Sequence, residues 1–136
     1  MTDHPSTWIS ASELTTLFAR KVLSPVDIVE AMVERAAKLQ PSLNAFVLID
    51  GDGAQAAAKA SEARWLKGQP LSALDGVPTT IKDTTAVKGW PTRYGSHATD
   101  ETPAGEDSEV ERLVAPEHDL LGERQARRVA VHDAVA

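Results

Sequence analysis

The sequence predicts an α/β fold, in which helices near the N-terminus are followed by short strands. Residues 10–41 carry apolar side chains at helical spacing. Residues 45–49 and 77–82 are short runs rich in strand formers and bounded by turn residues. Alanine, the strongest helix former, occurs 21 times in the chain.

Length and composition set the broad class of protein. The 136 residues fit one domain or part of a larger one, and 42% apolar with 25% charged residues indicates a folded body. The lack of cysteine excludes disulfides, Cys-ligated metals and a thiol nucleophile, and it permits a reducing compartment. A net charge of −6 opposes nucleic-acid binding. With no signal-like start and no run of ~20 apolar residues, we expect a soluble, cytoplasmic protein without a membrane partner.

Two helices are expected before residue 45. Ser10 and Glu13 have the spacing of a capping box and start a short helix that should end near Lys21. Residues 24–25 (Ser-Pro) start a second helix, which should stop at Pro41. The second helix has apolar residues at helical spacing: Ile28, Val29, Met32, Val33, Ala36 and Leu39.

Strands and one more helix follow. Ala45–Ile49 is expected to be a buried strand, because it is apolar throughout. The turn at residues 51–53 leads into an expected helix over Ala54–Lys67 that ends at Gly68. The Gly- and Pro-rich residues 71–96 leave room for short strands only, and Val77–Lys82 is the best candidate. A further helix should start near Asp107 or Ser108.

General sequence motifs do not predict a metal site or a phosphate site. Asp50, Asp52 and Gly53 suggest a calcium loop, but Ala54 stands where an oxygen ligand belongs, so a turn is preferred. The histidines lack a close ligand spacing, which favours dispersed surface positions: His4, His97, His118 and His132. We therefore expect neither a metal nor a cofactor.

Lys82 closes the strand candidate and has two possible environments. In an alternating strand it shares one face with Pro78 and Thr80. If that face were buried, desolvation would lower the lysine pKa and allow a neutral amine to act as a base. The alternative is an exposed lysine at the end of a strand, loosely paired with Asp83, and spacing alone favours this alternative.

Residues 74–96, LDGVPTTIKDTTAVKGWPTRYGS, closely resemble the lysine segment of the amidase signature family. The family pattern is similar to G-(I/V)-P-x-x-(I/V)-K-D, followed by V-x-G-x-P-T-x-x-G-S. Its matches are Gly76, Val77, Pro78, Ile81, Lys82, Asp83, Val87, Gly89, Pro91, Thr92, Gly95 and Ser96. The resemblance runs in order from about Ile9 to Val114, with helices and a strand upstream and a helix downstream.

This resemblance implies a Ser–cis-Ser–Lys hydrolase of carboxamides in which Lys82 is the catalytic lysine. In the family, that lysine relays a proton through a bridging serine to the nucleophile. The two family serines and the oxyanion donors belong to a later Gly/Ser-rich segment, which these 136 residues do not contain. Ser96 and Ser108 match a turn and a helix cap in the family pattern and are not expected to replace them.

The tail departs from the resemblance. We expect residues 1–114 to be the N-terminal part of an amidase-like domain with an incomplete core, and residues 115–136 to be a divergent tail. One interpretation is a helical tail with a solvated arginine face. The other is a frame change near codon 115, because Pro116 onward, read two bases later, can encode the family's Gly-Ala, three residues and Gly-Arg-Thr.

The expected function follows from what is present and what is missing. By resemblance the chain is an amidase-like hydrolase of carboxamide C–N bonds, acting on a small-molecule amide once its fold is completed. By itself it should be inactive, since Lys82 without a nucleophile lacks the core of the mechanism. The alternative is a non-catalytic fragment or an interaction or amidotransferase-like subunit that pairs with a complementing chain. Exposed strand edges would favour self-association, with aggregation as the other outcome.

Overall fold

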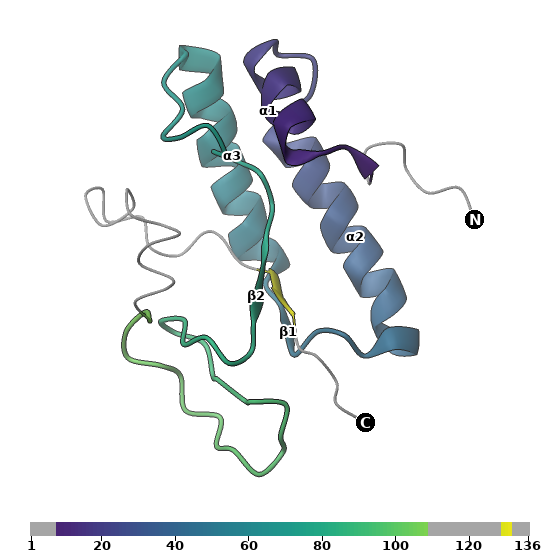
Figure 1. The fold of residues 1–136 in the computed structure, drawn as a ribbon, viewed down its shortest axis with the longest axis vertical. Coiled ribbons are helices and arrows are strands. Elements are labelled where there is room, and N and C mark those ends of the chain that lie inside the picture. Colours follow the sequence, from purple (N-terminus) through teal and green to yellow (C-terminus); the bar gives the residue numbers. More distant parts are fainter. Residues whose placement is uncertain (1–7, 109–128, 132–136) are drawn as a thin grey trace.

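The computed structural model describes residues 8–108 and 129–131 (Figure 1). In this part of the chain, helices and short strands are mixed, so the predicted α/β class is confirmed. The elements are α1 (Ala11–Ala19), α2 (Pro25–Leu43), β1 (Leu48–Ile49), α3 (Gly51–Lys67), β2 (Thr80–Lys82) and β3 (Val129–Val131).

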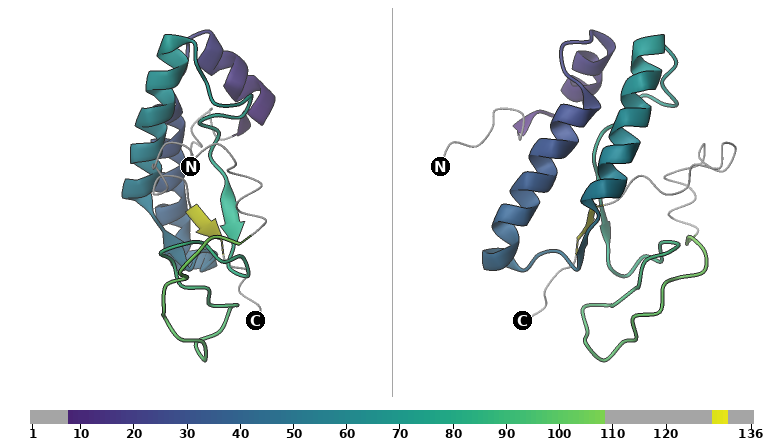
Figure 2. Two further views of the ribbon diagram at one scale, coloured as in Figure 1. Left: turned by 90° about the vertical axis from the view of Figure 1, so that its left-hand side faces the viewer. Right: turned by 180° about the vertical axis from the view of Figure 1, so that it is seen from behind.

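The elements form two layers. Helices α2 and α3 lie side by side, and α1 lies against their upper end. Seen from the side, β2 and β3 form a second layer beside this helix pair (Figure 2). The strand order is β1-β3-β2, with β3 antiparallel to β1 and parallel to β2. The sheet therefore joins segments that are far apart in the sequence.

The N-termini of α1 and α2 are fixed by the caps expected from the sequence. Ser10 Oγ accepts the Glu13 N–H, and the Glu13 carboxylate accepts the Ser10 N–H at 3.0 Å. Ser24 forms a second capping box with Asp27, whose Oδ2 accepts the Ser24 N–H at 3.2 Å. Helix α1 ends two residues before the predicted Lys21, which adopts a positive φ of 56°.

The prediction that Pro41 ends α2 is wrong, because the helix continues through Pro41 to Leu43. Proline removes a single N–H donor and its fixed φ suits a helix, so one near the C-terminus is tolerated. The helix ends where Asn44 enters the left-handed region, and the Asn44 N–H still donates to Gln40 O at 2.8 Å.

The predicted strand Ala45–Ile49 is wrong in length and in burial. Strand β1 contains only Leu48 and Ile49, and both are half-buried. The preceding residues form a connection in which the Gln40 side chain accepts the Phe46 N–H at 2.9 Å and donates to Phe46 O at 2.6 Å. A side-chain amide thus takes the hydrogen bonds that a neighbouring strand would have made.

Helix α3 begins three residues before the predicted Ala54. Asp50 is its N-cap, and the Asp50 carboxylate accepts the Gly53 N–H at 2.9 Å, so residues 51–53 form the first helical turn. The predicted end is confirmed: the helix stops at Lys67, and Gly68 adopts the left-handed conformation with φ 70°. The candidate calcium-loop residue Asp50 therefore acts as a helix cap.

Two small clusters of buried side chains hold the helices together. Leu14, Phe18 and Ile28 form one cluster, against which Trp65 packs. The second contains Val29, Ala54 and Ala58, where alanine methyl groups let α2 and α3 approach closely. Between the same two helices, Ser24 Oγ donates to Glu62 Oε1 at 2.5 Å. Alanine side chains of α3 therefore form part of the contact with α2.

We expect Phe18→Ala to destabilise the fold by about 3–5 kcal/mol, because it empties a core site. Phe18 is 1% exposed and contacts the Trp65 ring at a centroid distance of 6.2 Å. Val22→Ala is the control, since Val22 is 66% exposed. Urea unfolding followed by circular dichroism measures both; equal midpoints would contradict this assignment of the core.

Candidate functional site

The turn that precedes β2 is held to α3 by a buried ion pair. Arg64 Nε and Nη2 donate to the two carboxylate oxygens of Asp75, each at 2.7 Å. The Asp75 side chain is 3% exposed and that of Arg64 is 18% exposed. Trp65 Nε1 donates to Asp75 O at 2.9 Å, and the Leu71 N–H donates to Asp75 Oδ2 at 3.1 Å. The start of the lysine segment is thus fixed to the helical layer.

Gly76 fills the next position for a steric reason. Its φ is 82°, and a Cβ there would overlap Ser61 Oγ and lie 2.9 Å from Pro25 Cγ. Only glycine lets the backbone pass this close to α2 and α3 in a left-handed conformation. The Gly of the family pattern therefore serves the packing of the segment against both helices.

The charge state of Asp75 depends on this environment. Burial raises the pKa of the Asp75 carboxyl, but the hydrogen bonds from Arg64, the hydrogen bond from the Leu71 N–H and the Arg64 charge together outweigh burial. The net result is a pKa below the usual value for aspartate. Asp75 is consequently ionised at neutral pH.

Lys82 is the last residue of β2, and its side chain is exposed. Thr80 is exposed as well and Ile81 is half-buried, so Lys82 lies on the outer of the two strand faces. The structure therefore has the exposed lysine, the second of the two environments considered for it. Its carbonyl oxygen accepts the Thr85 N–H at 2.9 Å, which turns the chain directly after the strand.

Asp83, directly after the lysine, is buried and organises the following loop. Its Oδ1 accepts the Arg93 N–H at 2.8 Å and its Oδ2 accepts the Gly95 N–H at 3.0 Å. Tyr94 and Gly95 have φ values of 51° and 69°, and the Tyr94 N–H, between the two donors, donates to the backbone carbonyl of Asp83 at 3.4 Å. From the sequence, Asp83 is expected only as a loose partner of Lys82. Residue spacing does not predict that the Asp83 carboxylate is buried.

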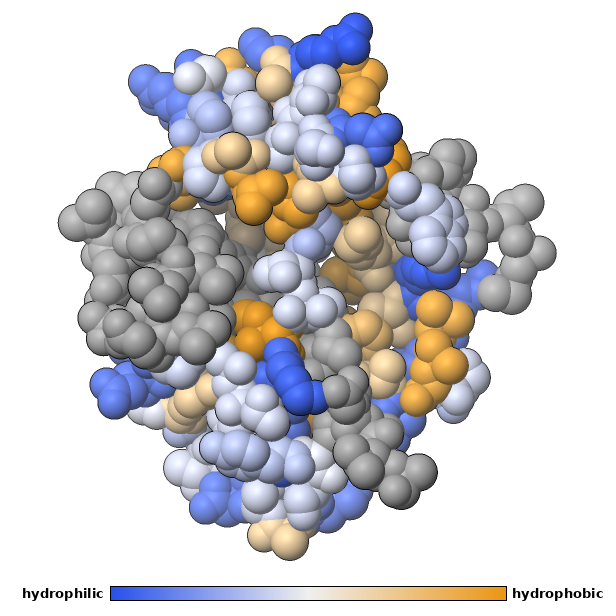
Figure 3. All heavy atoms as spheres, viewed as in Figure 1, coloured by the Kyte–Doolittle hydropathy of each residue, from blue (hydrophilic) through white to orange (hydrophobic). Residues whose placement is uncertain are grey.

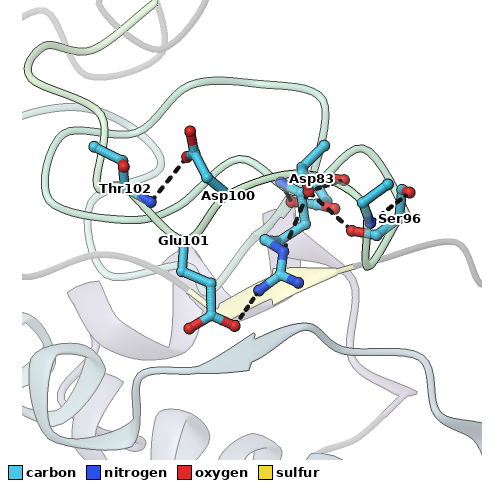
Figure 4. A network of polar contacts seen from close by, with 8 residues as sticks. Asp83, Ser96, Asp100, Glu101 and Thr102 are labelled. Atoms are coloured by element: carbon cyan, nitrogen blue, oxygen red, sulfur yellow. Dashed lines mark hydrogen bonds and ion pairs between the residues drawn. The ribbon is translucent and has the colours of Figure 1, made fainter.

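The loop is closed by further polar contacts (Figure 4). Arg93 Nη1 pairs with Glu101 Oε1 at 2.6 Å, and Asp100 Oδ1 accepts the Thr102 N–H at 3.0 Å. Farther along, the Gly89 N–H donates to Ala104 O at 2.9 Å. Residues 83–104 therefore fold back on themselves next to the end of β2.

Among the other residues considered from the sequence, Ser96 lies in the Asp83 loop, next to Gly95. Ser96 Oγ accepts the Ala98 N–H at 3.0 Å, a contact within a turn. The Ser108 N–H donates to Ala86 O at 2.9 Å, while the helix expected after it lies outside the described residues. His97 is exposed; the described part of the chain does not include the other three histidines.

No group of three or more His, Cys, Asp or Glu side chains in the described part of the chain is arranged to hold a metal ion. None of the described helices is both long and apolar enough to cross a membrane.

Comparison with known proteins identifies the family. The sequence pattern of the family described as Amidase matches residues 27–117, which include Lys82 and Asp83. An acylamidase from Rhodococcus erythropolis is 41% identical over 95 residues, or 70% of this chain and 20% of the relative. A glutamyl-tRNA(Gln) amidotransferase subunit from Salinispora arenicola is 41% identical over 96 residues, or 71% of this chain and 19% of the relative.

The fold agrees with the sequence match. A bacterial aryl acylamidase of the amidase signature family superposes with a TM-score of 0.75 and 28% identity, over 97% of this chain and 26% of that one. The chain therefore belongs to the amidase signature family, as the lysine segment predicted. It spans about a fifth of the length of the curated relatives it matches.

The Arg64–Asp75 pair should make stability depend on acid pH. Because the Asp75 pKa is lowered in the folded state, its contribution is present above the unfolded value of about 3.9 and is lost as pH falls through the lower folded value. We expect Asp75→Asn to lower stability at pH 7 by about 3–5 kcal/mol and to flatten the fall in stability below pH ~4.

Urea unfolding between pH 7 and pH 2.5 measures this effect. Glu106→Gln is the matched control, because Glu106 is an exposed carboxylate. Parallel pH profiles for Asp75→Asn and the unchanged chain would contradict the assigned role of Asp75.

Asp83 should control the order of the loop. Asp83→Ala leaves the Arg93 and Gly95 N–H groups without their acceptors, at a cost of about 1–3 kcal/mol. Asp83→Asn keeps one acceptor oxygen and should have a smaller effect. Amide hydrogen exchange at Arg93 and Gly95 measures the change, and unaltered exchange in Asp83→Ala would refute it.

Proposed function

We propose that this chain supplies the catalytic lysine, Lys82, to amide-bond hydrolysis of the amidase signature type. The observation that carries the proposal is the placement of Lys82 at the end of β2, between two anchored carboxylates. Asp75 fixes the start of the segment to α3, and Asp83 fixes the loop that follows. The lysine backbone is thereby held on both sides while its side chain stays exposed.

The chemistry follows from the family resemblance. A neutral Lys82 amine would accept a proton, through a bridging serine, from the serine that attacks the carboxamide carbonyl. The C–N bond then breaks, the leaving nitrogen takes a proton, and water hydrolyses the acyl-serine. A neutral lysine requires desolvation, so additional polypeptide has to cover the exposed Lys82 face.

The 136-residue chain alone should not hydrolyse amides. The Gly/Ser-rich segment that carries the family's nucleophile, bridging serine and oxyanion donors is not among these residues. A base without a nucleophile and without stabilisation of the oxyanion lacks the main contributions to rate. We propose a small-molecule carboxamide as the substrate class of the completed site, in the cytoplasm, without a cofactor.

A second candidate function is pairing, as one subunit of a complex, with a complementing chain. The strands of the described sheet contain two or three residues each, which is few for an independent sheet. Some relatives are themselves named as subunits, such as the glutamyl-tRNA(Gln) amidotransferase relative from Salinispora arenicola. In this proposal, the partner is a polypeptide that carries the serine-containing part of an amidase core.

We further propose that residues 115–136 are a frame-changed tail on the amidase-like residues 1–114. The family match ends at residue 117, three residues beyond Val114. Translation of the encoding nucleotides in all three frames provides the test. A Gly/Ser-rich amidase segment should continue in another frame, and its absence there would leave simple divergence of the tail.

The activity test has two arms. The purified chain is assayed for ammonia release from simple carboxamides, and we expect no turnover. It is then mixed with a polypeptide covering the remaining four-fifths of the Rhodococcus erythropolis acylamidase, where we expect turnover that Lys82→Ala abolishes. Lys88→Ala, another exposed lysine, is the control and should leave the turnover unchanged.

The outcomes separate the proposals. Robust turnover by the chain alone that Lys82→Ala removes would refute the claim of inactivity. Binding of the two polypeptides without turnover would favour the pairing function and oppose the catalytic one. Turnover in the mixture that survives Lys82→Ala would overturn the role of Lys82.

A further inference from the structure

Every strand pairing of the described sheet is made through β3. β1 pairs with β3 (Leu48 opposite Ala130), and β2 pairs with β3 on its other side (Ile81 opposite Ala130). β1 and β2 are therefore not neighbours in the sheet. Figure 2 shows β3, in yellow, alongside β2. Without residues 129–131, neither of the other two strands has the partner seen here.

The two walls of this arrangement are fixed by contacts that do not involve β3. β1 lies between the end of α2, where Gln40 binds the Phe46 backbone, and Asp50, the N-cap of α3. β2 lies between the Asp75 turn and the Asp83 loop. The segments flanking β1 and β2 are thus tied to the helices or to their own loop, while in the described sheet each of the two strands pairs only with β3.

The size and surroundings of the gap fit an extended peptide. Adjacent strands lie about 4.8 Å apart, so β1 and β2, as second neighbours, are about 10 Å apart and leave room for one strand. The occupant must run antiparallel to β1 and parallel to β2, which fixes its direction. Figure 3, in the view of Figure 1, shows apolar side chains in separate patches around the middle of this face, with polar side chains between them.

The connection to β3 does not require that the strand come from the same copy. Residues 109–128 separate Ser108 from Val129. Twenty residues reach up to about 70 Å when extended, far more than the distance across a domain of this size. Addition of an extended strand to a sheet is a common mode of peptide recognition, driven by main-chain hydrogen bonds.

We propose that the gap between β1 and β2 is an acceptor site for an extended polypeptide strand. The chain fills it with its own residues 129–131, and at higher concentration the same segment of a second copy takes that place. The product is a strand-swapped dimer with the β1-β3-β2 order preserved in each half. This interaction does not depend on the Lys82 amine or on amide hydrolysis, although the Lys82 backbone lies opposite Val131 in the pairing of β2 with β3.

Cysteine cross-linking tests the site, because the chain has no cysteine of its own. In Leu48→Cys/Ala130→Cys, the two Cα atoms are antiparallel partners at about 4.5–5.5 Å, within the range that a disulfide spans. The control, Ile49→Cys/Ala130→Cys, is one residue out of register, which places the thiols on opposite faces. We expect at least tenfold more intramolecular disulfide in the first variant at low protein concentration.

Exchange between copies is tested by mixing two single variants, Leu48→Cys and Ala130→Cys. We expect a disulfide-linked heterodimer whose yield rises with concentration and exceeds that from Ile49→Cys mixed with Ala130→Cys. Circular dichroism of each variant confirms that the helices are retained. Equal cross-linking in the in-register and out-of-register double variants would overturn the acceptor site, and equal yields from the two mixtures would overturn the exchange.

Discussion

The buried pair of Arg64 and Asp75 is the constraint on which the rest of the described structure depends. It joins the C-terminal part of α3 to the turn that begins the lysine segment, with two hydrogen bonds of 2.7 Å. Trp65, the residue next to Arg64, donates a hydrogen bond to the backbone carbonyl of Asp75 and packs on Phe18. One polar contact therefore links the helical core to β2. Removing one partner of such a pair lowers the stability of the fold by more than the intact pair contributes, because a buried charge is left uncompensated.

The same arrangement fixes the backbone on both sides of Lys82. Asp75 and Asp83 are both buried carboxylates whose oxygens accept hydrogen bonds, and Lys82 lies on the strand between them. The lysine side chain itself remains exposed. The scaffold thus fixes the backbone position of the lysine, and the proposed role of Lys82 requires further polypeptide that covers its side chain.

Local signals in the sequence predicted local structure well. The capping boxes at Ser10 and Ser24 and the left-handed Gly68 are all present, because each depends on residues within three or four positions. The predicted bounds of β1 and α3 were wrong because a local side-chain contact competes with the predicted element. The Asp50 side chain caps α3, so residues 51–53 belong to the helix and not to a turn. The Gln40 side chain binds the N–H and the carbonyl of Phe46, so β1 begins only after this residue.

The sequence by itself determined the family, the helices and the position of Lys82, since these depend on short-range spacing and on a dense motif. Only the tertiary structure decided that Asp83 is buried beneath the Arg93–Gly95 backbone and that Asp75 pairs with Arg64. It also decided that β3 lies between β1 and β2, so that Ile49 pairs with Val129, 80 positions later in the chain. These contacts join residues about ten to eighty positions apart, and the free energy that selects such partners comes from burial and pairing in three dimensions, which residue spacing does not encode.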